Sequence, residues 1–159
     1  MDWSWLNGLF PNADPSNSKW ASHPTPSYNC IAFAVGKTNK PWWPAEDDLG
    51  GYFWPPGLPR EPYLQETLQN FINAFATEGY GVCADGTLEA GIEKIVIYQD
   101  KADRPTHAAR QLPDGRWVSK LGDDDDIKHS EPSVLHSDLY GVSTVFMSRR
   151  IEYAQDKTS

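Results

Sequence analysis

Residues 106–121 read THAARQLPDGRWVSKL, and this stretch determines how the second half of the chain can fold. The runs 106–112 and 116–121 suit extended backbone. Between them stands Pro113-Asp114-Gly115, a sequence typical of a tight turn. The stretch therefore predicts a β-hairpin.

The length of the hairpin loop determines which side chains share a face. A three-residue loop pairs Leu112 with Arg116, and it then sets Ala109 opposite Ser119. In that register His107, Ala109 and Ser119 lie on one face of the sheet. A two-residue loop would turn Ser119 to the other face.

The sequence around the hairpin predicts more strands and one long helix. Strands are expected at 81–83, 94–99 and 141–149. Between Pro62 and Gly79 apolar residues recur at the spacing of an amphipathic helix. The apolar stripe consists of Leu64, Leu68, Phe71, Ile72 and Phe75.

A second, shorter helix is expected after residue 28, where the sequence reads YNCIAFAVG. Ser27 or Asn29 can cap its start, and Gly36 suits a left-handed end. The segment is apolar all round and should be buried. The sequence thus predicts an α+β fold with a short buried helix carrying Cys30, one central amphipathic helix and an antiparallel sheet of about five strands.

The 159 residues fit a single domain, 1–159. Residues 1–26 are expected to wrap it as irregular structure, and 37–62 to form a long loop rich in Trp and Pro. Residues 150–159 are expected to form a flexible tail.

Composition excludes several classes of partner. The formal net charge of −8 opposes binding to nucleic acid and to anionic membranes. The N-terminus has no basic and apolar leader, and no apolar run approaches the length that spans a bilayer. A cytoplasmic location with reduced thiols is the expectation, although specialised export would leave no mark in the sequence.

Cys30 is the residue best placed for chemistry. In the first turn of a helix, free N–H groups and the helix dipole lower the pKa of a thiol. The same N–H groups, with Asn29 as their support, can stabilise an oxyanion. Burial as a small apolar residue is the alternative role for Cys30, and the expected one for Cys83.

The segments 28–34 and 106–112, followed by the polar position Ser119, carry a family resemblance. Their order of Cys, His and polar residue resembles papain-like thiol hydrolases, most closely the NlpC-type and CHAP-like branch. Residues 27–150 are also similar to an uncharacterised bacterial domain family.

The papain-like resemblance implies a role for each matching residue. Cys30 would be the nucleophile, His107 the general base and Ser119 the group that orients the imidazole. Gln111, Asp125, Asp126 and His129 are other candidates for the third role. Pro24, six residues before Cys30, leaves the side-chain oxyanion donor of papain without a counterpart.

Trp42, Trp43 and Trp54 either form a substrate cleft above the thiol or pack the long loop against the core. The acidic run 122–126 is expected to be a solvated turn. His129 and His136 lack partners at metal-ligand spacing, so no metal and no cofactor are predicted.

Two functions remain open. The first is a cysteine hydrolase or acyltransferase that cleaves an amide or thioester of a peptide or amide substrate through an acyl-enzyme on Cys30. The second is a catalytically inactive binding module, of inhibitor or immunity type, that grips a protein partner with an acidic, Trp-rich surface.

Overall fold

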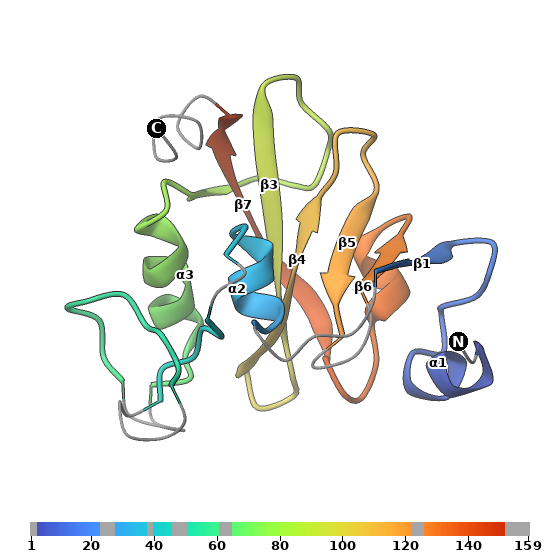
Figure 1. Ribbon diagram of the computed structural model, residues 1–159, viewed down its shortest axis with the longest axis horizontal. Coiled ribbons are helices and arrows are strands. Elements are labelled where there is room, and N and C mark those ends of the chain that lie inside the picture. Colours follow the sequence, from blue (N-terminus) through green and yellow to red (C-terminus); the bar gives the residue numbers. More distant parts are fainter. Residues whose placement is uncertain are drawn as a thin grey trace.

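The computed structural model describes residues 3–22, 28–37, 40–45, 51–60, 65–121 and 126–151. Within these ranges the chain forms one antiparallel sheet of seven strands, in the order β1-β6-β5-β4-β3-β7-β2 (Figure 1). The strands are β1 (Ser18–Ser22), β2 (Gly81–Cys83), β3 (Ile92–Gln99), β4 (Pro105–Gln111), β5 (Trp117–Lys120), β6 (Asp126–His129) and β7 (Val142–Arg150). The first strand therefore pairs with the sixth, far along the chain.

The helices are short and lie around the sheet. They are α1 (Trp3–Leu9), α2 (Cys30–Ala34), α3 (Leu68–Ala76) and the 3-10 helix η1 (Pro132–Leu135). Thr77 ends α3, and Gly79 follows with a φ of 90°, in the left-handed region that favours glycine. Across the described ranges, no helix is long and apolar enough to cross a bilayer.

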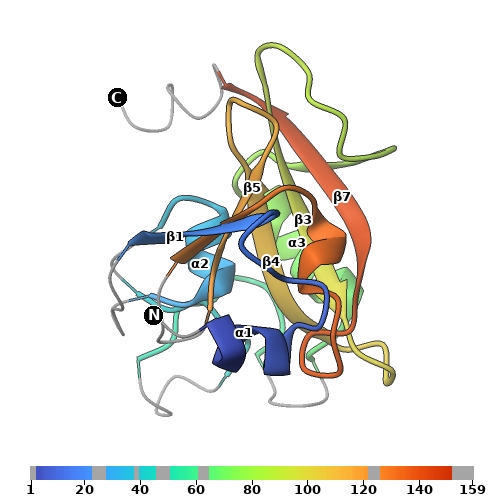
Figure 2. The same cartoon turned by 90° about the vertical axis from the view of Figure 1, so that its right-hand side faces the viewer.

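Two hydrophobic cores lie on opposite faces of the sheet, because successive side chains of a strand point in opposite directions. Figure 2 shows α2 on one side of the strands and η1, in orange, on the other. The α2-side core includes Cys30, Ile31, Trp42, Trp54, Phe71, Phe75, Ile95, Ile97 and Ala108. The α1-side core includes Leu6, Phe10, Val96, Tyr98, Ala109, Trp117, Ile127, Leu135 and Tyr140.

The predicted hairpin is present with the three-residue loop. Leu112 N–H donates to the Arg116 carbonyl, and Arg110 pairs with Val118 in the ladder between β4 and β5. Continuing this register sets Ala109 opposite Ser119. The predicted face is therefore correct, and Ala109 and Ser119 both belong to the α1 side of the sheet.

The prediction of about five strands around one central helix is wrong. Strands β1 and β6 were not expected, because both are short and carry Lys, Ser or Asp among few apolar residues. The amphipathic helix begins at Leu68, where Thr67 caps it, and the expected start at Pro62 lies outside the described residues. It packs beside β2, at the edge of the sheet, so it is not central (Figure 1).

The segment boundaries also need correction. Residues 1–26 are not irregular throughout, because α1 and β1 form there and their apolar side chains pack against the sheet. In the loop 37–62, the described residues form no helix or strand beyond an isolated bridge between Trp42 and Phe53. Strand β7 includes Arg150, and the rest of the expected tail, from 152 on, lies outside the described residues.

Gly141 should be a position where no side chain is tolerated. Its φ is 75°, and an added Cβ would overlap the carbonyl group of Gln99. Gly91 has the same φ but open space around the added Cβ. We expect Gly91→Ala to lower the free energy of unfolding by about 1–2 kcal/mol, the usual cost of the left-handed conformation. Gly141→Ala should cost clearly more in urea unfolding, and equal losses would contradict the overlap.

Candidate functional site

Asn29 fixes helix α2 to the Trp-rich loop. Its side-chain oxygen accepts hydrogen bonds from the N–H groups of Ala32, at 3.0 Å, and Trp42, at 3.0 Å. Its amide nitrogen donates to the Trp42 carbonyl at 2.7 Å. Asn29 is therefore the N-cap of α2, as one of the two predicted options, and its polar atoms bind backbone groups of this protein.

Cys30 is the first residue of α2 and is only 8% exposed. Burial raises the pKa of the Cys30 thiol to about 11, although the N–H of Ala108 and the charge of Lys120 act in the opposite direction. Desolvation thus outweighs the helix N-terminus at this position. The thiol is protonated at neutral pH, contrary to the expected low pKa.

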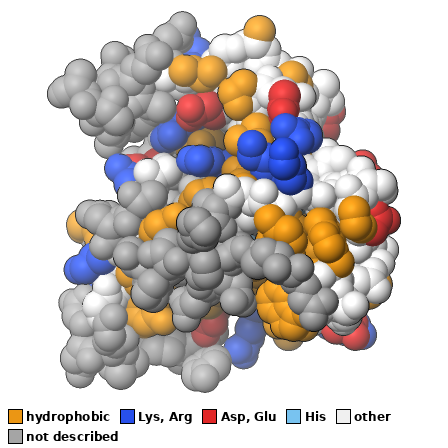
Figure 3. Space-filling view, turned by 45° about the vertical axis from the view of Figure 1, so that its right-hand side comes forward, with side chains coloured by type: hydrophobic (Ala, Val, Ile, Leu, Met, Phe, Trp, Pro, Cys, Tyr) orange, Lys and Arg blue, Asp and Glu red, His pale blue; other side chains and the backbone are white. Residues whose placement is uncertain are grey.

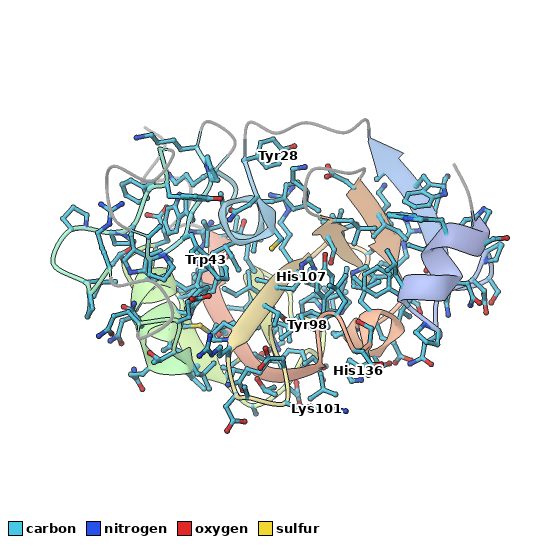
Figure 4. All side chains as sticks on the ribbon, turned by 90° about the horizontal axis from the view of Figure 1, so that it is seen from below. Tyr28, Trp43, Tyr98, Lys101, His107 and His136 are labelled. Atoms are coloured by element: carbon cyan, nitrogen blue, oxygen red, sulfur yellow. The ribbon has the colours of Figure 1, made fainter. Side chains whose placement is uncertain are left out.

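His107 lies on the other side of the sheet from Cys30. Its ring stacks on Tyr140, with centroids 4.1 Å apart, and meets Tyr98 edge to face at 5.1 Å. Both tyrosines belong to the α1-side core, whereas Cys30 packs with Ala108 in the α2-side core. Figure 4 shows Tyr28 on the α2 side, with Tyr98 and His136 on the opposite side.

Ser119 is bonded to His129 instead of His107. The Ser119 hydroxyl and His129 Nε2 are 2.8 Å apart, and His129 Nδ1 lies 2.9 Å from the Glu131 carbonyl. Because a carbonyl only accepts, Nδ1 carries the proton and Nε2 accepts from the hydroxyl. This is the hydrogen-bond order of a Ser-His pair, but Ser119 is fully buried and His129 is 1% exposed.

The predicted third groups do not converge on His107 either. Neither ring nitrogen of His107 has a hydrogen-bond partner among the described residues. Gln111 donates to the Gly86 carbonyl at 2.7 Å. Asp126 pairs with Lys120 in the ladder between β5 and β6, on the α2 side, and Asp125 lies outside the described residues.

The three tryptophans pack inside the fold. Trp42 is 4% exposed and Trp54 is 2% exposed, and Trp43 is half-buried. Trp43 and Trp54 both meet Phe71 edge to face, at 5.2 and 5.0 Å. Of the two alternatives for these rings, the structure thus shows packing of the loop against the core.

A recess of about 210 Å³ lies between the end of α2 and the sheet. Arg110, Arg149, Glu93 and Tyr80 line it. Arg149 Nε is 2.7 Å from a Glu93 oxygen, and its guanidinium also lies 4.4 Å from the centre of the Tyr80 ring. The positive charge of Arg149 is therefore already balanced.

Arg110 has no such balance. Its guanidinium lies over the Phe33 ring at 4.7 Å, and within the described ranges it makes no hydrogen bond and no ion pair. Burial raises the pKa of Tyr80 to about 12, so the Tyr80 hydroxyl keeps its proton and can donate. The recess therefore presents hydrogen-bond donors and one uncompensated positive charge.

Sequence reasoning missed Arg110, although a signal was present. If His107 and Ala109 face one side of a strand, Ala108 and Arg110 must face the other, where α2 packs. Lys120 was missed for the same reason: it is fully buried, with its ammonium 5.2 Å from the centre of the Tyr28 ring. As far as the structure is described, His, Cys, Asp and Glu form no cluster that could hold a metal ion.

The buried histidines make stability depend on pH. Burial lowers the pKa of His129 to about 4, and that of His107 well below its usual value. The unfolded chain takes up these protons near pH 6.5, so stability is full above that pH and falls as the pH drops toward 4. We expect His129→Gln to reduce this fall by about 3 kcal/mol.

Urea unfolding at several pH values between 7 and 4 measures the effect. His136→Gln is a control, because that ring is less buried. If wild type and His129→Gln lose stability in parallel, His129 is not buried in its neutral form.

Comparison with known proteins identifies the chain only at the level of a family. No curated protein and no solved structure matches it. A family model described as "Domain of unknown function (DUF7689)" matches residues 19–148, which include α2, the whole hairpin and every residue that lines the Arg110 recess except Arg149. The chain therefore belongs to the family described as domain of unknown function DUF7689.

Proposed function

We propose that this protein is a binding module that holds an anionic group in the Arg110 recess. The observation that carries the proposal is the Arg110 guanidinium, which lines a recess without an acidic partner among the described residues. A guanidinium offers five N–H donors and is always charged. An anion that fills the recess would satisfy these donors.

A binding module was one of the two predicted functions, with an acidic, Trp-rich binding surface. The Arg110 recess takes the place of that surface here. Trp42 and Trp54 are buried, so they do not supply an aromatic surface for a partner. A second group of basic residues, Lys19, Arg116 and Lys128, lines another recess near β1, β5 and β6. Figure 3 shows Lys and Arg side chains, in blue, gathered on one face of the molecule. Arg116 is already paired with Asp114, at 2.8 Å, so the Arg110 recess is the better candidate.

Anion binding should raise the melting temperature. A ligand at ten times its Kd adds about 1.4 kcal/mol, or about 4 °C for a domain of this size. We expect a panel of propanoate, phosphate and sulfate, at constant ionic strength, to include at least one such ligand. Arg110→Gln should abolish the increase, and Arg116→Gln, with the same loss of charge, should keep it. Equal increases in both variants would contradict the proposal.

A cysteine hydrolase remains a second candidate, which the position of Cys30 favours. Cys30 is the first residue of α2, and the backbone of Ala108 acts to lower the pKa of its thiol. The geometry supports it less well, since a base would have to reach Cys30 from its own side of the sheet. His107 faces the α1-side core, so Lys120 is the titratable group whose charge acts on the thiol.

Thiol reactivity separates the two functions. A thiol with a pKa near 11 holds about one hundredth of the thiolate of an ordinary thiol at neutral pH. We therefore expect iodoacetamide to label Cys83 before Cys30, with Cys83→Ala and Cys30→Ala used to assign the two rates by mass spectrometry. Faster labelling of Cys30 would favour the hydrolase.

We also propose a cytoplasmic location. Cys30 and Cys83 are both free thiols in the structure, which suits a reducing compartment.

A further inference from the structure

We propose that the group held in the Arg110 recess is a single carboxylate, attached to a short apolar stem. This inference rests on the proposed function and names the chemical class of its ligand. A carboxylate of this kind can come from a free small acid or from the C-terminus of a peptide.

Charge limits the ligand to one negative charge. Side chains of Glu93, Arg110 and Arg149 face the same side of the sheet, because Glu93 pairs with Arg149 and Ile95 with Arg110. Glu93 and Arg149 balance each other at 2.7 Å, and Lys94, which also lines the recess, is paired with Glu89 at 2.6 Å. Among the described residues that line the recess, the charge of Arg110 is the one left without a partner. A carboxylate matches this charge. A phosphate that carries two charges would leave one of them beside Glu93.

The size of the recess also favours a small group. The volume of about 210 Å³ falls below the usual range of ligand pockets, about 300–1,000 Å³. A liquid water occupies about 30 Å³, so the recess holds only a few heavy atoms. Such a space suits the end of a molecule, with the remainder outside.

The geometry of the hydrogen-bond donors on Arg110 and Tyr80 suits a carboxylate. An arginine and a carboxylate are both planar and form two parallel hydrogen bonds. The Phe33 ring lies under the guanidinium and restricts its orientation. Tyr80 lines the same recess, where the charge of Arg110 acts on its hydroxyl, so this hydroxyl can supply a further donor.

Apolar groups complete the walls. Val35 lines the recess from the end of α2, and Leu112 and Pro113 line it from the hairpin. A hydrocarbon stem next to the carboxylate would pack against these side chains, whereas a phosphate has no such stem. Charge, size, donor geometry and apolar walls therefore all point to the same class of ligand.

The test compares three small probes by NMR, with the Arg110 Nε–Hε resonance as the readout. Propanoate carries the charge and the stem, propanamide carries the stem alone, and inorganic phosphate carries charge alone. We expect propanoate to shift the Arg110 resonance with a roughly millimolar Kd, as befits a ligand of five heavy atoms. Propanamide should cause no saturable shift, and phosphate should bind the recess at least about tenfold more weakly.

Two variants test the geometry. Arg110→Lys keeps the charge but loses the planar fork, so propanoate should bind about tenfold or more weakly, as followed by shifts of backbone amides around the recess. Arg116→Gln, outside the recess, should bind propanoate like the wild type. The melting temperature of each variant, measured without ligand, shows whether it is folded.

The outcomes separate the two proposals. If phosphate binds the recess as tightly as propanoate, the anion-binding function stands and the carboxylate inference is wrong. If no anion shifts the Arg110 resonance, both are wrong.

Two further probes distinguish a peptide C-terminus from a free small acid as the source of the carboxylate. They are an acetylated tripeptide with a free C-terminus and the same tripeptide with an amidated C-terminus. Tighter binding of the free acid than of propanoate supports a peptide terminus, and equal or weaker binding supports a small free acid. Equal binding of the acid and amide forms overturns the inference.

Discussion

The alternation of side chains along β4 decides which groups of this protein can meet. His107 and Ala109 face the α1-side core, whereas Ala108 and Arg110 face α2. Because β4 lies inside the sheet, paired with β3 and β5, neither set of side chains can change face without breaking two ladders. The sheet thus separates the thiol from the imidazole and brings the guanidinium under α2.

This separation changes the chemistry available on each side. On the α1 side, His107 and His129 are buried, His107 against the rings of Tyr98 and Tyr140, and the neutral forms of both histidines are the stable ones. On the α2 side, Arg110 and Lys120 are cations held near aromatic rings, at 4.7 Å from the Phe33 centre and 5.2 Å from the Tyr28 centre. The imidazoles of His107 and His129, which could transfer protons, are therefore buried in the core. The guanidinium of Arg110, which could bind an anion, lines the recess beside α2.

The sequence predicted local structure better than long-range arrangement. The hairpin register followed from its turn, and the cap at Asn29 followed from residue type, because both depend on neighbours in the chain. Strands β1 and β6 were not predicted, because they pair with each other across more than half the chain and have little apolar pattern of their own.

The separation of the predicted site residues Cys30 and His107 has a related cause. The sequence around Cys30 does not predict which face of the sheet α2 will cover. Burial, which raises the thiol pKa, is likewise set by the whole fold. By contrast, the placement of Arg110 opposite His107 was implicit in the predicted strand.

The pairing of β1 with β6 also has a consequence for synthesis on the ribosome. Trp20 pairs with Ile127, so the N-terminal segment must wait for on the order of a hundred further residues before its partner strand exists. At about 5–20 residues per second, this delay lasts roughly 5–20 s. Throughout it, Leu6 and Phe10 lack the contacts that bury them in the finished protein. The nascent chain thus presents an apolar leading end that a chaperone would have time to hold.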